Sequence, residues 1–496
     1  MIKKVKNPKN PYEESKMYSF DLFGTLIGPE NVYKKSIFRD LSFLLARITN
    51  RHVLYKPDNR SNLKTFTYKK WVDIYHELIS QNEIVVIVSN THLSLESVHK
   101  LLKTHQVELP DKIYLSSEYL TSKKYNLFEC VKKDYQSEKW LHYGDDVFLD
   151  QMSENFGAEY YPVVNGKSQL IQMGVISRRQ SKLLRPTSVF QFEFIDYIEN
   201  TNWGGKELWE SIGAIYSFLG SVLFFQKIET MSRTEVDFWI LIGRDMTFVS
   251  EMLGMYQKNN YQLVNLRRDE IENKESSNWL NILKTIKEKK SDNQSIGVAD
   301  ISFKRSLAKA ILNHSLDFNF ELYLLKTRNN NVGSKSRFVL SNNSIFGIGN
   351  WSSFREIWEI VLCAASKVEK NTAPHEVLLA RGFSDTCKTL GTSLSKVSIA
   401  DLHAIQRLFK TLVSRPSYKQ MKVFGSFLHD ASGAQFQSID MLVEIASLES
   451  YTGRSYWRRA TMLGIMKKDN GFQLNRLYLF VRWFRSETRY YIRKFS

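Results

Sequence analysis

The stretch Tyr18–Ile27, YSFDLFGTLI, joins a short apolar run to a single acid and a glycine turn. Its first part is rich in aromatic and apolar side chains, so residues 17–23 are expected to form a β-strand. Asp21 stands near the end of that strand, and Gly24 begins the turn that follows. A strand that delivers one carboxylate to a glycine turn indicates a site for a ligand or for chemistry.

Strand and helix patterns alternate downstream of this stretch. The run EIVVIVSN, residues 83–90, is continuously apolar and β-branched, as expected for a strand buried on both faces of a parallel sheet. Further strands are expected over 112–117, 139–146 and 158–163, with helices at 94–105 and 125–135 and one more before residue 158. This alternation predicts an α/β fold with a doubly wound parallel sheet, whose functional residues lie at the carboxyl ends of strands.

The rest of the chain divides into three parts. Residues 166–190 are expected to form a linker, because its second half is polar and basic and carries Pro186. A second, basic α/β domain is expected over 191–440, with strands at 238–243, 261–266, 295–301 and 320–326. Residues 441–496 are expected to form a helical tail in which arginines and aromatic residues occupy different faces.

Composition limits the class of protein. The chain has 496 residues, 43% of them hydrophobic, which is ample for two or three globular domains. Its three cysteines form no CxxC motif, so neither a disulfide framework nor a zinc site is expected. The basic N-terminus has no apolar signal-peptide core, and the uncharged run 211–226 is shorter than the roughly 20 residues that cross a bilayer. A cytoplasmic protein is therefore expected.

The formal net charge of +17 is unevenly distributed. Residues 1–165 hold 23 Lys and Arg against 21 Asp and Glu, whereas residues 166–496 hold 46 against 31. A basic second half favours an anionic partner such as a phosphorylated substrate, a nucleic acid or an anionic membrane surface. No nucleic-acid-binding motif is present, so nucleic acid is the partner least expected.

Four places in residues 1–165 together match the needs of phosphoryl transfer. Asp21 could act as nucleophile and form an aspartyl-phosphate. Ser89 ends a second strand, and Lys123 or Lys124 precedes a helix; a hydroxyl and an ammonium can hold phosphoryl oxygens. Asp145 and Asp146 end another strand, and with Asp21 they could bind Mg²⁺. His142 is expected to pack or hydrogen-bond at its strand end rather than to catalyse.

These four places resemble the motifs of the haloacid dehalogenase superfamily over roughly residues 15–165. FDLFGTL matches the first motif, Ser89 the second, Lys123 the third, and GDDVFLD the fourth, with Asp150 completing GDxxxxD. The resemblance implies a hydrolase with a small helical cap at about 28–80. It implies Asp21, Ser89 and Lys123 as catalytic residues, and Thr25 and Asn90 beside the substrate. It also implies Mg²⁺ held by Asp21 and Asp145, with Asp146 or Asp150, and by the main-chain carbonyl of Phe23.

Phe23 departs from the phosphatases of this superfamily, in which that position holds a second Asp that acts as acid and base. Such catalysis is worth about 100- to 10,000-fold in rate. Members resembling the dehalogenases have a non-acid there but work without metal, whereas GDD here suits Mg²⁺. The first expectation is a phosphatase acting on a phosphorylated metabolite such as a sugar phosphate. Two alternatives remain open, a phosphate-binding scaffold fused to a basic domain with a transferase or membrane-docking role, and a dehalogenase.

The whole chain more distantly resembles long bacterial proteins of this superfamily that are encoded with surface-polysaccharide biosynthesis enzymes. The corresponding segments are LIGRDMTF, with Arg244 as a substrate-binding candidate, NLRRDE and ADISFKRS. That resemblance implies a role in polysaccharide biosynthesis. For the basic tail three alternatives remain open: packing on the second domain, lying on an anionic membrane at the inner face, or binding a protein or nucleic-acid partner, with glycan-assembly enzymes among the possible proteins.

Overall fold

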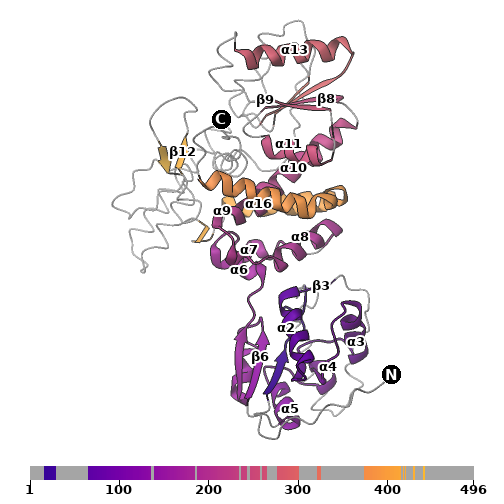
Figure 1. Cartoon of the computed structure of the whole chain (residues 1–496), viewed down its shortest axis with the longest axis vertical. Coiled ribbons are helices and arrows are strands. Elements are labelled where there is room, and N and C mark those ends of the chain that lie inside the picture. The colour runs from indigo at the N-terminus through magenta and orange to yellow at the C-terminus, as the bar shows by residue number, and fades with distance from the viewer. Residues whose placement is uncertain are drawn as a thin grey trace, which may run out of the picture. The chain divides into compact units, whose positions relative to one another are not determined.

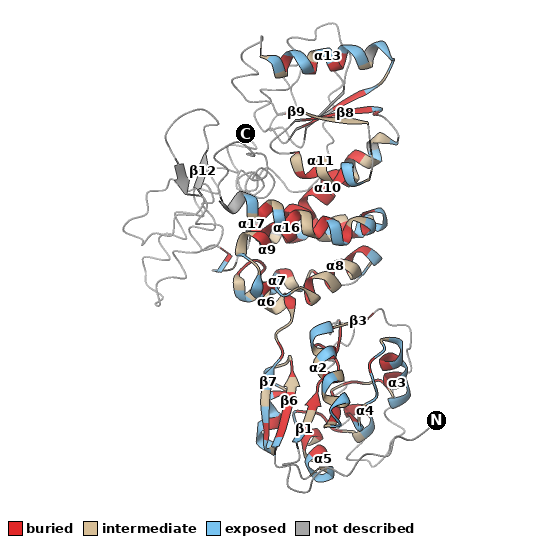
Figure 2. Ribbon diagram, in the orientation of Figure 1, coloured by how far each residue is buried: buried red, intermediate tan, exposed pale blue. Residues whose placement is uncertain are grey.

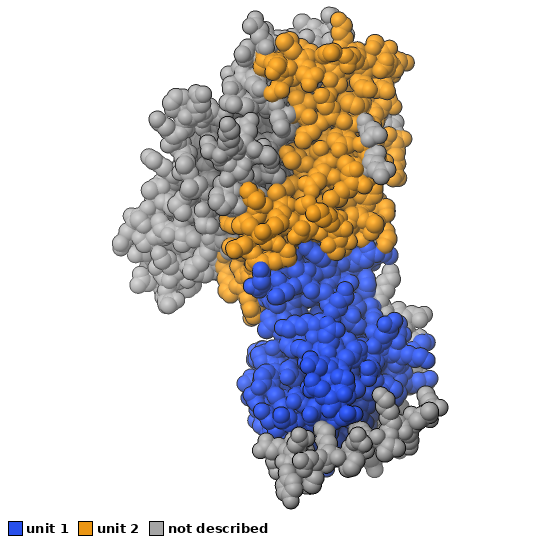
Figure 3. All heavy atoms as spheres, in the orientation of Figure 1, with its two compact units in different colours: residues 1–169, 184–205 blue, residues 170–183, 206–496 orange. Residues whose placement is uncertain are grey.

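A computed structural model describes residues 16–28, 65–135, 139–184, 187–233, 236–242, 246–256, 258, 260–264, 276–300, 321–324, 374–414, 417, 419–420, 428–430 and 439–441. The chain divides into two compact units (Figure 3). Unit 1 comprises residues 1–169 and 184–205, and unit 2 comprises residues 170–183 and 206–496. Both contain a parallel sheet with helices, as the α/β prediction requires (Figure 1).

The sheet of unit 1 has five parallel strands. In spatial order they are β5 (Lys112–Leu115), β4 (Ile84–Ser89), β1 (Lys16–Phe20), β6 (Lys139–Gly144) and β7 (Ala158–Pro162). β1 pairs with both β4 and β6, and Phe20 lies opposite Ile87 on one side and Tyr143 on the other. The stretch that begins with β1 is therefore at the centre of the sheet.

Helices cover both faces of this sheet, and β4 is accordingly a buried, mostly apolar run (Figure 2). Val85 and Ile87 of β4 belong to one buried cluster, with residues of α2 (Lys69–Ser80) and α3 (Leu95–Thr104). Val86 and Val88 belong to the opposite cluster, with residues of α5 (Leu127–Asp134). Successive side chains of a strand point to opposite faces, so one run of residues supplies both cores.

Shorter elements complete unit 1. They are β2 (Ile27–Gly28) and β3 (Phe66–Thr67), which pair antiparallel, α4 (Ser116–Tyr119), the 3₁₀ helix Gln151–Phe156 and α8 (Val189–Asn200). The helix expected before residue 158 is thus a 3₁₀ helix. Of the expected cap at 28–80, residues 29–64 lie outside the described part of the chain. The described helix α2 packs on the sheet instead of standing apart from it, because Val72 and Tyr75 join the core.

Unit 2 contains a four-stranded parallel sheet in the order β11 (Glu321–Leu324), β10 (Ile296–Asp300), β8 (Phe238–Ile242) and β9 (Tyr261–Val264). These strands fall within the four segments expected from the sequence. The described α-helices of this unit include α7 (Arg178–Ser181), α9 (Leu208–Ile212), α10 (Phe218–Ser232), α11 (Thr247–Met255), α13 (Ser277–Ser291), α16 (Pro374–Leu390) and α17 (Ile399–Ser414). A π-helical turn, Gly213–Ser217, joins α9 to α10. β12 (Leu428–Asp430) and β13 (Ile439–Met441) form an antiparallel pair.

The expected linker 166–190 contains structure. It holds α6 (Gly166–Met173), α7 and the start of α8, and Leu170, Val175 and Ile176 are fully buried. Polarity suggested a linker, but the buried positions include polar side chains: Ser177 and Gln180 are buried, and Gln180 donates to the Tyr216 hydroxyl at 2.9 Å. The stretch Leu208–Thr230 is long and apolar enough to cross a membrane, but 89% of its apolar window is buried within the protein. The tail from residue 442 onward lies outside the described residues.

Candidate functional site

Three strands of unit 1 deliver polar side chains to one edge of the sheet. Asp21 directly follows β1, Ser89 is the last residue of β4, and Asp145 directly follows β6. Because β1 lies between β4 and β6 and all three are parallel, these residues meet at the carboxyl edge. Carboxyl ends of strands are where open α/β sheets place their ligands.

Asp21 is held by its main chain and by one of its two carboxylate oxygens. Its N–H donates to the carbonyl of Tyr143 at 2.8 Å. Oδ1 accepts hydrogen bonds from the Leu22 N–H at 2.8 Å and the Lys123 ammonium at 2.9 Å. Among the described residues no hydrogen bond reaches Oδ2, and the side chain is 12% exposed. The carboxylate is thus fixed in orientation with one oxygen available.

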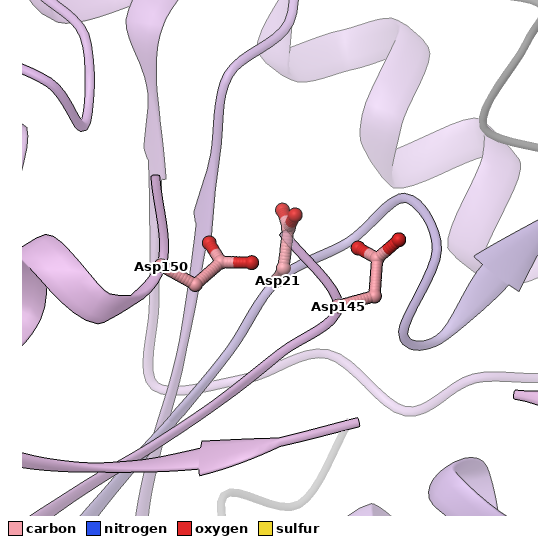
Figure 4. Close-up of side chains that lie close together, drawn as sticks. All are labelled: Asp21, Asp145 and Asp150. Atoms are coloured by element: carbon pink, nitrogen blue, oxygen red, sulfur yellow. The ribbon is translucent and has the colours of Figure 1, made fainter. Parts of the chain in front are cut away.

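Three carboxylates converge at this edge (Figure 4). Asp21, Asp145 and Asp150 each offer an oxygen within 4.8 Å of the others, and Asp21 and Asp150 are buried. Anionic oxygens grouped in this way are the ligands that hard divalent cations prefer.

Two glycines make room for these carboxylates. A Cβ on Gly24 would lie 2.3 Å from the carboxylate carbon of Asp145, and Gly24 has a left-handed φ of +87°. A Cβ on Gly144 would lie 2.2 Å from an oxygen of Asp150. The glycine turn after Asp21 therefore lets the backbone approach the acid cluster closely.

Asp150 and Asp146 differ in what their carboxylates do. Asp150 is fully buried, and its Oδ1 lies 2.5 Å from Lys123 Nζ and 3.4 Å from His142 Nε2. Its Oδ2 accepts from the Asp146 N–H at 2.9 Å. The Asp146 carboxylate instead accepts from the N–H groups of Phe148 and Leu149, at 3.1 and 3.2 Å, and so orders the turn after β6.

Of the two candidate lysines, Lys123 is the one that lies at the acid cluster. It is 1% exposed and pairs with both Asp21 and Asp150. Lys124 is its sequence neighbour, but the Lys124 ammonium lies over the ring of Tyr125, 5.6 Å from its centre. Asn90 Oδ1 accepts a hydrogen bond from the Lys123 N–H at 2.9 Å, so Asn90 holds the segment that carries the lysine.

Burial and charge act on these groups together. Burial raises the pKa of Asp21 to about 7, although Lys123 works in the opposite direction. Burial also opposes the charged forms of Lys123 and Asp150, but the attraction between the two charges is stronger. The pKa of Lys123 therefore rises and the pKa of Asp150 falls. Lys123 and Asp150 therefore form a charged pair, beside an Asp21 that a bound cation would help to ionise.

Two buried hydroxyl groups near this edge have no hydrogen-bond partner in the described structure. They are Thr25 Oγ1, fully buried in the turn after Asp21, and Ser89 Oγ, 1% exposed at the end of β4. A buried hydroxyl normally has a partner, because leaving it unsatisfied costs about 1–3 kcal/mol. Ligand oxygens would supply one.

Phe23 belongs to the hydrophobic core. It is 5% exposed, its backbone bridges to Ile27, and it joins the same cluster as Phe20 and Leu93. Its side chain is therefore part of the packing under α2 and α3. Arg244, the other substrate-binding candidate, lies outside the described residues.

Three further polar residues sit beneath the acid cluster. Ser19, Trp140 and His142 are buried and hydrogen-bonded to one another, and His142 reaches Asp150. Sequence reasoning expected only a packing or hydrogen-bonding histidine. The alternation in KWLHYG is a signal for two of the three, because it puts Trp140 and His142 on one face of β6.

No protein-family model matches this chain, and no curated protein matches it. The assignment of a function therefore depends on the geometry of the site.

Proposed function

We propose that unit 1 is a Mg²⁺-dependent hydrolase of the haloacid dehalogenase type that acts on a phosphorylated metabolite. The observation that carries the proposal is the state of Asp21, which has one oxygen fixed by Leu22 and Lys123 and the other without a hydrogen bond among the described residues. An oriented carboxylate beside an ammonium and other acids suits attack on phosphorus. A sugar phosphate of surface-polysaccharide synthesis is the substrate class we propose.

The residues present fit Mg²⁺. Asp21 and Asp145 would hold it directly, with the Phe23 carbonyl as the third protein ligand, since Mg²⁺ takes few carboxylates and keeps water and substrate oxygens. Asp150 would not bind the cation directly, because both of its oxygens already accept hydrogen bonds from Lys123, His142 and Asp146. It would instead hold Lys123 in place. The bound cation would offset the charge of the phosphoryl group.

The chain's own side chains divide the remaining tasks. Oδ2 of Asp21 would form a bond to phosphorus while the ester P–O bond breaks and its electron pair leaves with the alcohol oxygen, which takes a proton from solvent. Lys123 would hold phosphoryl oxygens, and the unpaired hydroxyls of Ser89 and Thr25 would donate to them. Water would then attack the aspartyl-phosphate, releasing phosphate and restoring the Asp21 carboxylate.

The lack of an acid at Phe23 predicts slow turnover. Its side chain packs in the core and has no proton to give or take, so the leaving alcohol and the attacking water depend on solvent. Positioned acid–base catalysis is worth about 100- to 10,000-fold, so turnover should be slow by that order.

The test is phosphate release from a panel of sugar phosphates in the presence of Mg²⁺. Wild-type protein should release phosphate, the Asp21→Asn variant should not, and chelation should stop the reaction. If wild type releases no more phosphate than Asp21→Asn, the proposal is wrong.

The core position of Phe23 also favours a second candidate, a phosphate-binding module without turnover. Both candidates predict that beryllofluoride, a phosphoryl mimic, binds in the presence of Mg²⁺ and that Asp21→Asn abolishes this binding. Only the hydrolase also releases phosphate, so binding without release selects the module.

A further inference from the structure

A chain of buried polar groups runs beneath the acid cluster, on the face of the sheet that α5 covers. Trp140 Nε1 donates to Ser19 Oγ at 2.8 Å, and Ser19 Oγ lies 2.8 Å from His142 Nδ1. His142 Nε2 then lies 3.4 Å from Asp150 Oδ1, the oxygen that also holds Lys123. Ser19 and His142 are fully buried, and Trp140 is 5% exposed.

The shorter contacts along this chain favour one direction of hydrogen-bond donation. The indole N–H can only donate, so Ser19 Oγ is its acceptor. The Ser19 hydroxyl proton can go to His142 Nδ1 at 2.8 Å or to the Leu141 carbonyl at 3.5 Å, and the shorter contact is the better hydrogen bond. His142 Nδ1 then accepts, so the proton of the neutral ring is on Nε2 and points to Asp150.

A neutral donor has a specific consequence for Asp150. A charged imidazolium at this place would compete with the Lys123 ammonium for the same oxygen, Asp150 Oδ1. A neutral N–H restrains the carboxylate without offsetting its charge. Asp150 therefore keeps its full attraction for Lys123.

We propose that His142 is a positioning residue, which acts through Asp150 to hold the Lys123 ammonium against Asp21. Ser19 and Trp140 stabilise the tautomer of His142 that carries its proton on Nε2. This inference rests on the proposed function for its catalytic meaning, but the hydrogen-bond chain can be tested without it. Partners of this kind behind functional side chains typically change affinity or activity by about 10–100-fold.

The alternative is that His142 only fills space, since its ring also packs edge-on against Phe128 with ring centres 4.9 Å apart. A pair of variants distinguishes positioning by a hydrogen bond from the filling of space. His142→Leu keeps an apolar side chain in the cluster but removes the donor. His142→Gln keeps an N–H near the position of Nε2. Phe128→Leu is the matched control, because it disturbs the same packing and leaves the hydrogen-bond chain in place.

The experiment is ¹⁵N NMR of the lysine ammonium and histidine ring groups in the full chain. A buried, hydrogen-bonded ammonium exchanges slowly with water and gives an observable signal, whereas a solvated lysine such as Lys124 does not. We expect a Lys123 signal in wild type, in His142→Gln and in Phe128→Leu, and its loss in His142→Leu. The His142 ring should be neutral with its proton on Nε2. A Lys123 signal retained in His142→Leu, or a ring protonated on Nδ1, would overturn the inference.

Kinetics give the second measurement. When phosphate release is normalised to the amount of folded protein, His142→Leu should lower kcat about 10–100-fold with little change in KM. His142→Gln should have a kcat close to that of wild type. An unchanged kcat in His142→Leu contradicts the positioning role. If wild type matches Asp21→Asn, the proposed function fails instead, and the NMR result alone decides whether His142 positions Lys123.

Discussion

Asp21 combines deep burial with an oriented carboxylate, and this combination makes its charge depend on what binds. Burial raises its pKa to about 7, and the nearby Asp150 adds to the effect, while Lys123 opposes it. Near neutral pH a proton therefore competes with a cation for the Asp21 carboxylate. A cation can coordinate the carboxylate only after that proton leaves.

This predicts how Mg²⁺ binding depends on pH. Below about pH 7, affinity should rise about tenfold for each pH unit, because one proton is displaced, and it should level off above the pKa. Isothermal titration calorimetry between about pH 5.5 and about pH 8.5 measures the slope. In Asp21→Asn the slope should disappear. Affinity that stays constant across this range in wild type would contradict a site built on Asp21.

Gly24 should be needed both for backbone geometry and for the position of Asp145. Alanine at Gly24 would be strained at φ +87° and would also place its Cβ 2.3 Å from the Asp145 carboxylate. Gly157 is the matched control, with φ +95° but only Lys132 Nζ at 3.9 Å. Both Gly→Ala variants should lose about 1–2 kcal/mol of unfolding free energy from the left-handed conformation.

Only Gly24→Ala should also lose Mg²⁺ and beryllofluoride binding. Chemical denaturation and calorimetry measure the two effects separately. Equal loss of binding in Gly157→Ala would mean that strain alone, and not contact with Asp145, explains the result.

At the scale of elements, the helical segment formed by α9 and the π-helical turn packs closely against α16 in unit 2, and a glycine lies at each of two close contacts. A Cβ on Gly213, in the π-helical turn, would lie 2.1 Å from the Leu379 carbonyl oxygen. A Cβ on Gly382, in α16, would lie 1.9 Å from the Glu210 carbonyl oxygen in α9. Both contacts are with backbone, so no side-chain rotation can relieve them.

Gly382→Ala should therefore destabilise the protein, by about 1–3 kcal/mol, even though alanine favours helices. The measurement is the free energy of unfolding in denaturant. Gly391→Ala is the control, because nothing lies within 4 Å of its added Cβ, and its effect should stay within about 0.5 kcal/mol. A neutral Gly382→Ala would show that the two helices can separate without loss.

At the scale of the whole molecule, unit 1 is assembled from two separate parts of the chain. Asn200, at the end of α8, accepts from the Lys69 N–H at 2.8 Å and donates to the Thr67 carbonyl at 3.0 Å. It thus caps α2 and binds β3 from a position 131 residues further along the chain. A boundary near residue 165 would separate α8 from the helix that it holds.

Asn200→Ala should accordingly lower stability by about 0.5–1.5 kcal/mol, because it removes the hydrogen bonds to the part-buried Thr67 carbonyl and the exposed Lys69 N–H. Hydrogen exchange followed by mass spectrometry should show faster exchange in residues 66–80. Asn155→Ala removes an exposed side chain whose one hydrogen bond among the described residues goes to the Met152 sulfur, and it should change neither measurement. Unchanged exchange at 66–80 in Asn200→Ala would mean that α8 does not stabilise α2.

The sequence by itself determined the strands, their parallel arrangement in an α/β fold, and the edge at which Asp21, Ser89 and Asp145 meet. Those features follow from local patterns: a continuous apolar run marks a buried strand, and the residue after it lies at the strand's end. The helix α2 lies within the helical cap that the resemblance implied at about 28–80, but its packing on the sheet was not predicted, because Tyr75 meets Phe20 only in the folded core.

Only the tertiary structure decided which of two adjacent residues reaches the acid cluster. Lys123 and Lys124 are alike in sequence, and the sheet brings only the first to Asp21 and Asp150. Asp145 and Asp146 are adjacent, yet one joins the cluster and the other orders a turn. The physical reason is distance along the chain: Ser19 and His142 are 123 residues apart, and their contact depends on strand order and register, which no local pattern encodes.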